Sequence, residues 1–77
     1  MNQNIFDAIE SGSCSADEAI EIDTNLSKAQ PSEVPDHQLK SMIDYIDFRF
    51  LRKAVVPSLQ DALRKLHKAL SERYFAA

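Results

Sequence analysis

Residues 39–56, LKSMIDYIDFRFLRKAVV, decide the fold because they carry more apolar side chains than one buried helix face holds. An α-helix turns by about 100° per residue. That spacing puts one apolar group on one side: Leu39, Met42, Ile43, Ile46, Phe50 and Ala54. A second group spreads over much of the remaining circumference: Tyr45, Phe48, Leu51, Val55 and Val56. A helix that is apolar on two sides needs cover on both. The rest of a 77-residue chain can supply one cover, and we expect another molecule to supply the second.

The composition favours helix throughout. The chain has one glycine and three prolines against many Ala, Leu, Glu, Asp and Lys residues, and these are good helix formers or helix-cap residues. We predict an all-α fold, namely a small three- or four-helix bundle or a helical hairpin with a central two-faced helix. Such a fold could form a dimer. The helices are expected at about 3–11, 16–28, 37–55 and 58–74, in one domain with a linker at 29–36.

Local signals mark the helix ends. Gly12 is the natural stop of the first helix, because helix ends often need a residue at positive φ. Ser15 and Glu18 have the spacing of a capping box at the start of the second. Asp36, after Pro35, is the expected cap of the central helix.

Pro57 allows two arrangements of the C-terminal half. It can open a new helix at the first position, where its missing N–H costs nothing, or one long helix can bend there. In a continuous helix, Tyr45, Arg52 and Leu59 recur every seven residues and form a seam for self-association with the following leucines. The alternative is that Leu59, Leu63, Leu66 and Leu70 pack only on the chain's own helices.

The inventory of reactive residues predicts no enzyme. Cys14 is the only cysteine, and His37 and His67 are the only histidines. One cysteine excludes an internal disulfide and a cysteine-based zinc site, and one glycine cannot build a phosphate-binding loop. We therefore expect no catalytic site, no metal and no cofactor.

Charge divides the chain into two halves. Residues 1–37 carry eight acids against one lysine, a net charge of −7, and residues 38–77 carry eight bases against four acids, a net charge of +4. The basic half allows a second hypothesis, a nucleic-acid contact, because phosphate binding needs several cations on one surface. Its candidate residues are Arg49, Arg52, Lys53, Arg64, Lys65 and Lys68.

The segment 33–49 resembles the Hha/YmoA family of small bacterial co-regulators. That family has an acidic-capped helix with an Asp-His-Arg at comparable spacing, and the matching positions here are Asp36, Leu39, Asp47 and Arg49. Phe48 replaces the middle histidine. The resemblance implies a protein that modifies a nucleoid-associated, DNA-binding partner without reading DNA itself.

The sequence thus favours a small cytoplasmic protein-binding module, bacterial or phage-encoded, that acts as an adaptor, chaperone-like or regulatory protein. It has no stretch apolar enough for a membrane span and no basic, apolar leader at its start. It is expected to bind a partner helix or to form a homodimer through an apolar helix face. The residues assigned to that face are Tyr45, Phe48, Leu51, Arg52, Val55, Leu59, Leu63, Leu66 and Leu70.

Overall fold

The computed structural model describes residues 3–12 and 16–76, and these residues form α-helices, short 3₁₀ turns and loops without a strand. The all-α prediction is therefore confirmed at the level of four α-helices. In chain order the elements are α1 (Gln3–Ser11), α2 (Ala16–Ser27), η1 (Pro31–Glu33), η2 (Asp36–Gln38), α3 (Leu39–Leu51) and α4 (Pro57–Ala76). Cys14 and Ser15 lie outside the described residues, so the capping box predicted at Ser15 does too.

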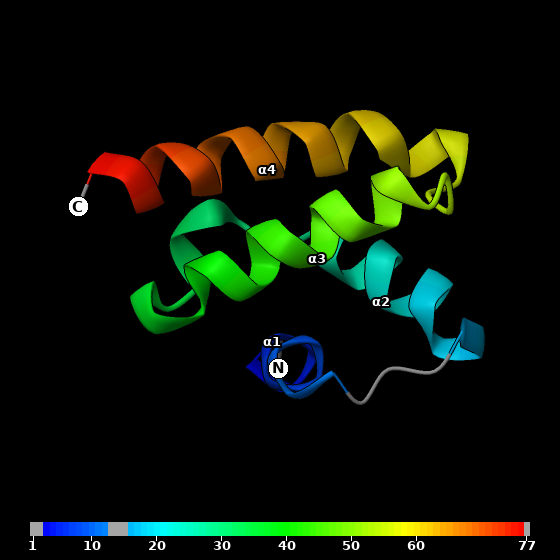
Figure 1. Ribbon diagram of the computed structural model, residues 1–77, viewed down its shortest axis with the longest axis horizontal. Coiled ribbons are helices and arrows are strands. Elements are labelled where there is room, and N and C mark those ends of the chain that lie inside the picture. Colours follow the sequence, from blue (N-terminus) through cyan, green and yellow to red (C-terminus); the bar gives the residue numbers. More distant parts are fainter. Residues whose placement is uncertain (1–2, 13–15, 77) are drawn as a thin grey trace.

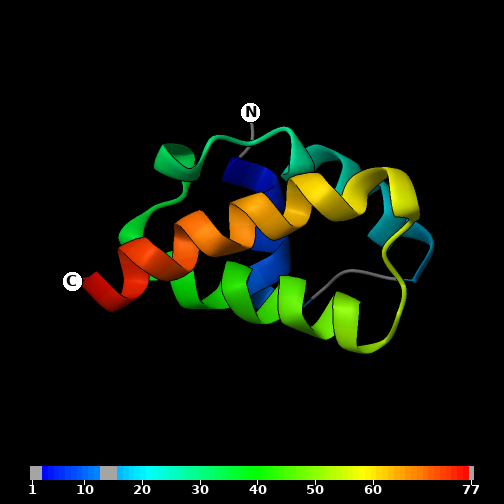
Figure 2. The ribbon, with the colours of Figure 1, turned by 90° about the horizontal axis from the view of Figure 1, so that it is seen from above.

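Helix α3 lies in the middle of the molecule (Figure 1). Helix α4 runs antiparallel to it along one side and α1 lies on the other side, while α2 passes behind α3 in this view and packs against α4. Seen from above, α1 crosses the direction of α3 and α4 (Figure 2). Contacts join α3 to both α4 and α1, and α2 also reaches α4. Helix α3 therefore has the central position that the sequence predicts.

The core is built from the inward faces of all four helices. Fully or nearly fully buried side chains include Phe6 and Ile9 of α1, Ile22 and Leu26 of α2, Leu39, Met42, Ile43 and Ile46 of α3, and Leu63, Leu66 and Leu70 of α4. On α3 all four buried positions belong to one of the two apolar groups recognised in the sequence, and Phe50 and Ala54 of the same group are half-buried. Burial of that group orients α3, since rotating the helix would expose it to water.

Helix α3 ends at Leu51, four residues before the predicted end at residue 55. The chain leaves it through a Schellman-type turn. Ala54 N–H donates to the Arg49 carbonyl at 3.0 Å and Lys53 N–H to the Phe50 carbonyl at 2.9 Å, and Lys53 has a φ of 54°. Pro57 is then the first residue of α4. The bent continuous helix, and with it the seven-residue seam through Pro57, is therefore wrong.

The linker between α2 and α3 is tied to the end of α4. Arg73 donates to the Pro31 carbonyl and to Asp36 Oδ1 at 2.7 Å. Asp36 opens η2, and Gln38 has the N-cap position of α3, so the predicted role of Asp36 as cap of α3 is wrong. Its carboxylate instead pairs with Arg73, which no local pattern in the sequence indicates.

Helix α1 is ended by Gly12 and is attached to the start of α3 through Gln38. Gly12, at a φ of 71°, ends it as expected, and its N–H donates to the Ile9 carbonyl at 3.1 Å. Buried Gln38 donates from Nε2 to Asp7 Oδ1 at 2.7 Å and to Glu10 Oε1 at 2.9 Å. One amide group thus holds two carboxylates of α1 against the start of α3.

Candidate interaction surface on helix α3

The outer face of α3 exposes two large apolar side chains near its C-terminal end. Phe48 is 53% exposed and Leu51 is 78% exposed. The guanidinium of Arg52, the residue that caps the helix, lies 5.5 Å from the centre of the Phe48 ring. We call these three residues, together with half-buried Tyr45 at their edge, the α3 patch. Water in contact with Phe48 and Leu51 costs free energy that a covering surface would recover.

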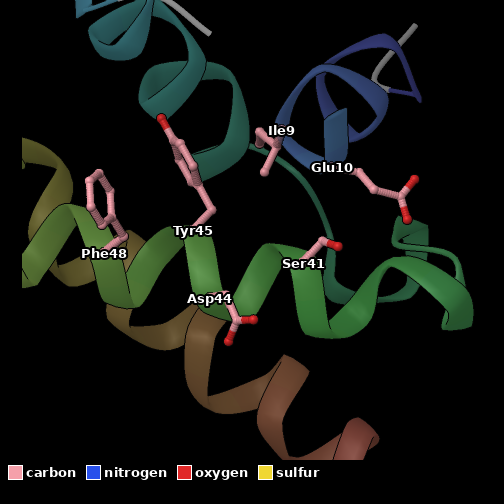
Figure 3. Close-up of a pocket in the computed structure, with 6 residues that line it drawn as sticks. All are labelled: Ile9, Glu10, Ser41, Asp44, Tyr45 and Phe48. Atoms are coloured by element: carbon pink, nitrogen blue, oxygen red, sulfur yellow. The ribbon is translucent and has the colours of Figure 1, made fainter. Parts of the chain in front are cut away.

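A shallow pocket of about 310 Å³ adjoins the patch. Ile9 and Glu10 of α1 form one wall, and α3 supplies the remainder: Ser41, Asp44, Tyr45 and Phe48. Tyr45 and Phe48 rise on the same side of α3, while Asp44 points the other way (Figure 3). The lining combines apolar side chains with the carboxylates of Glu10 and Asp44.

The edge of the patch is fixed from beneath by a buried carboxylate. Asp23 of α2 is 1% exposed. Its Oδ1 accepts a hydrogen bond from the Tyr45 hydroxyl at 2.8 Å, and its Oδ2 accepts from Arg49 Nε at 2.9 Å and Nη2 at 2.6 Å. The hydrogen bond to Asp23 raises the pKa of Arg49 above its ordinary value, although burial opposes the rise. The ring of Tyr45 is thereby held in one orientation beside Phe48.

The residues assigned to the apolar face separate into two groups. Tyr45, Phe48, Leu51 and Arg52 lie together on the outside of α3. Val55, Leu63, Leu66 and Leu70 are buried in the chain's own core, and Leu59 packs against that core. The leucine stripe of α4 therefore faces inward and offers no shared seam, which is the alternative in which the leucines pack on their own helices. A turn between α3 and α4 folds α4 back and directs its stripe onto α3.

The six basic candidates for a nucleic-acid contact have different surroundings. Arg49 is engaged with Asp23 and also donates from Nη2 to the Ala54 carbonyl at 3.2 Å. Arg64 lies 5.0 Å from the centre of the Phe50 ring. Arg52 lies over Phe48, and Lys53 occupies the left-handed turn position. Lys65 and Lys68 are exposed on α4. Four of the six thus have a contact or a turn position within the chain, but only Arg49 has a half-buried side chain, and the other five are exposed.

Polar groups elsewhere on α3 join helices together. Asp47 Oδ1 lies 2.7 Å from the buried Nε2 of His67 on α4, although the angles do not meet those of a hydrogen bond. Lys40 and Asp44 form an exposed ion pair at 2.8 Å within α3, and the hydrogen bond that Lys40 donates to Asp44 raises the pKa of Lys40. Among residues 3–12 and 16–76, His, Cys, Asp and Glu side chains nowhere gather in a group of three that could hold a metal ion.

Sequence reasoning missed two residues that position this surface. Asp23 stood out only as an interruption of the apolar stripe of α2, and that interruption was the available signal for a buried partner on another helix. Gln38 gave no signal, because its two acceptors lie 31 and 28 residues earlier in the chain.

Within the described part of the chain, no helix is both long enough and apolar enough to span a membrane.

Comparison with known proteins adds no relative to this picture. No family model, no curated protein and no solved structure matches the chain. The likeness of residues 33–49 to the Hha/YmoA family therefore rests on its four matching positions. Two of those, Asp36 and Arg49, make ion pairs inside this fold.

Proposed function

We propose that this protein is a small protein-binding module, an adaptor, chaperone-like or regulatory protein, that acts through the α3 patch. The observation that carries the proposal is the exposure of Phe48 and Leu51 side by side on a helix whose opposite face is buried. Aromatic and arginine side chains contribute most to binding energy at protein interfaces. Phe48, Tyr45 and Arg52 supply both kinds at one site.

Three features of the surroundings support the same proposal. The patch lies on a regular helix, which presents its side chains at fixed spacing. Asp23 and Arg49 hold Tyr45 in place before any partner arrives, so less conformational entropy is lost on binding. The adjoining pocket offers a cavity for one side chain of the partner.

The nucleic-acid alternative receives less support from the geometry. Arg49 is directed into the protein, and Arg64 is drawn onto an aromatic ring. The outward cations that remain are divided between the end of α3 and the polar face of α4. A phosphate backbone is bound through several cations on one surface, and the exposed acids Asp61 and Glu72 share α4 with them.

A photo-crosslinking experiment in the native cells tests the proposal. A benzophenone amino acid replaces Leu51, where an apolar aromatic side chain preserves the character of the patch, and the matched control carries it at exposed Lys65 on α4. We expect protein adducts from position 51 and few from position 65. Adding Phe48→Asp, which removes the neighbouring apolar surface, should abolish the adducts from position 51.

Circular dichroism of each purified variant shows whether the helices are intact. Adducts equally abundant at both positions, or a folded protein that gives none at position 51, would contradict the proposal. Adducts that consist of nucleic acid instead of protein would favour the alternative function.

A further inference from the structure

We propose that the partner of the α3 patch is an acidic segment of another protein, whose apolar side chains cover Phe48 and Leu51 while its carboxylates pair with Arg52 and Lys53. The inference rests on the function proposed above and adds the chemistry of the partner. It is carried by charge complementarity at the C-terminal end of α3. Two exposed apolar side chains lie there beside two exposed cations that the described part of the chain does not neutralise.

Phe48 has an apolar and a cationic neighbour one turn further along α3. Leu51 and Arg52 follow it by three and four residues, and residues at these spacings lie on the same helix face. Arg52 keeps helical backbone angles at the C-cap, and its guanidinium lies 5.5 Å from the centre of the Phe48 ring. A flat guanidinium on a ring still presents donors at its edge to a carboxylate. Apolar side chains that cover Phe48 therefore bring neighbouring carboxylates within reach of Arg52.

The cations at this end of α3 have no internal counter-charge. Within residues 3–12 and 16–76, neither Arg52 nor Lys53 forms an ion pair with an acid of its own chain. An exposed cation without an internal partner is free to pair with an anion that a partner brings. Like charge on a partner would be repelled at the same place, so the pair of cations selects for acids.

The acids of α3 itself are engaged elsewhere. Asp44 pairs with Lys40 at 2.8 Å and points away from the side of the helix on which Phe48 rises (Figure 3). Asp47 Oδ1 lies 2.7 Å from Nε2 of His67 on α4. The charged group closest to Phe48 in its own helix is thus the Arg52 guanidinium, which lies over its ring.

Lys53 carries its charge at a backbone position that is unfavourable for lysine. Its φ of 54° is left-handed, a conformation that glycine adopts with little strain and that few other residues adopt. Within the described residues, its side chain makes no hydrogen bond or ion pair that would offset this cost. Residues held in such conformations cluster at functional sites. A lysine here places a second cation directly after Arg52, which is a role that glycine could not fill.

A protein segment fits this surface better than a nucleic acid does. A phosphate backbone is held by several cations on one surface, and this end of α3 offers two. A nucleic-acid base would stack on an exposed aromatic ring, but the Arg52 guanidinium already lies over Phe48. Leu51, the most exposed apolar side chain of α3, is aliphatic and is covered by apolar side chains instead.

Selection from a display library of random peptides tests the chemistry of the partner without assuming its sequence. The full chain is the bait. The double variant Phe48→Ser/Leu51→Ser keeps both cations and first depletes the library of peptides that bind elsewhere or through charge alone. We expect the enriched peptides to combine apolar residues with Asp or Glu. With Arg52→Glu/Lys53→Glu as the bait, Lys and Arg should replace the acids.

Fluorescence anisotropy of a labelled enriched peptide measures the contribution of each cation. The surface is small, so we expect a Kd on the order of tens of micromolar. Arg52→Glu turns an attraction into a repulsion and should raise the Kd roughly tenfold, and Lys53→Asn should raise it roughly threefold. Asparagine tolerates positive φ, so the second variant removes the charge without adding strain. Lys65→Glu, exposed on α4, is the matched control and should leave the Kd unchanged.

Enriched peptides that are neutral or basic would overturn the inference. So would a library that yields no binder, or a Kd that is indifferent to Arg52→Glu. An oligothymidylate that binds the wild-type chain more tightly than the enriched peptides would assign the two cations to nucleic acid. Circular dichroism of each variant ensures that lost binding is not lost folding.

The crosslinking experiment separates this inference from the proposed function. Mass spectrometry of the adducts from position 51 identifies the crosslinked segment of the partner. Protein adducts whose segments are neutral or basic would remove the acidic partner while the proposed function stood. Absence of any adduct would remove both.

Discussion

Arg49 of α3 donates two hydrogen bonds to a single carboxylate oxygen of Asp23 on α2, 26 residues earlier in the chain. The carboxylate is almost completely buried, and the guanidinium also reaches the Ala54 carbonyl in the turn after α3. One ion pair therefore connects two helices and the turn that leads to α4. Its loss leaves charged groups in a desolvated place without a partner.

Removing the carboxylate should be strongly destabilising. Asp23→Ala should lower the free energy of unfolding by about 3–5 kcal/mol, because it strands Arg49. Tyr45→Phe deletes one hydrogen bond to the same carboxylate and should cost about 1 kcal/mol. Urea titration followed by circular dichroism measures both. Glu21→Ala, at an exposed position of the same helix, is the control and should stay within about 0.5 kcal/mol; equal losses for Asp23→Ala and Glu21→Ala would contradict the role of the pair.

The contribution of the Asp23–Arg49 ion pair to stability should persist at alkaline pH. Since the pKa of Arg49 is raised from an already high ordinary value, its contribution to stability is fully present below the ordinary pKa of arginine and is lost only as the pH rises through the higher pKa of the folded state. A lysine in the unfolded chain has a pKa of about 10.4, so in Arg49→Lys the contribution of the cation should begin to fall above that pH and be lost as the pH rises through the higher pKa of the paired, folded lysine.

We therefore expect the stability gap between wild type and Arg49→Lys to widen by about 1 kcal/mol between pH 8 and pH 11. Urea titrations at both pH values measure it. Lys65→Arg, on the exposed face of α4, serves as the control. A gap of the same size at both pH values would show that the ion pair does not depend on the cation's charge.

The turn after α3 contains a residue in an unfavourable conformation. Lys53 has a φ of 54°, a region that costs an L side chain about 1 kcal/mol or more and costs glycine little. Lys53→Gly should raise the free energy of unfolding by about 1 kcal/mol, as read from the midpoint of thermal or urea unfolding. Lys65→Gly inside α4 should have the opposite sign by a similar amount. A loss of stability in Lys53→Gly would mean that its side chain has a stabilising contact.

The attachment of α1 should depend on the amide of Gln38. Gln38→Glu replaces a donor to Asp7 and Glu10 with a third carboxylate, and like charges in a buried place repel. Amide hydrogen exchange in α1 should accelerate more than exchange in α4. His37→Glu adds the same charge one residue earlier at an exposed position and should leave α1 protected. Unchanged protection in Gln38→Glu would show that Phe6 and Ile9 suffice to hold the helix.

The linker between α2 and α3 should become more mobile when Arg73 loses its guanidinium group. Arg73→Met keeps most of the side-chain volume but removes the bonds to Pro31 and Asp36. We expect faster amide exchange at residues 32–36 and a stability loss of about 1–2 kcal/mol. Lys68→Met, exposed on the same helix, controls for the apolar substitution. Equal exchange rates in the two variants would indicate that packing of Val34 orders the linker by itself.

Periodicity located the elements because it is a local property. The apolar spacing of residues 39–50 predicts the buried face of α3, and Gly12 predicts the end of α1, since both signals need only the adjacent turns of chain. The end of α3 escaped prediction because Lys53 is not a glycine, so nothing in residues 51–56 marks the reversal. The extension to residue 55 followed from Ala54 and Val55, which are indeed buried or half-buried, but in the turn.

All four residues of the α3 patch belong to the set that the sequence assigned to an apolar face, and the rest of that set is buried or packed against the core. The two-faced character of 39–56 pointed to Phe48 and Leu51, whose exposure is that of a second apolar side. The leucines of α4 were assigned to the same surface because the sequence does not reveal the direction in which α4 returns. Because α4 folds back along α3, its leucine stripe faces the core.

The sequence by itself determined that this chain is helical, where its helices begin to within two residues, and that one of them is apolar on more than one side. Those properties depend on residues within a few turns of each other. Only the tertiary structure decided which apolar side stays in contact with water, and which of the charges are internal. Asp23, Arg49 and Gln38 meet partners 22 to 31 residues away, and such a meeting depends on how the helices pack, which no short stretch of sequence encodes.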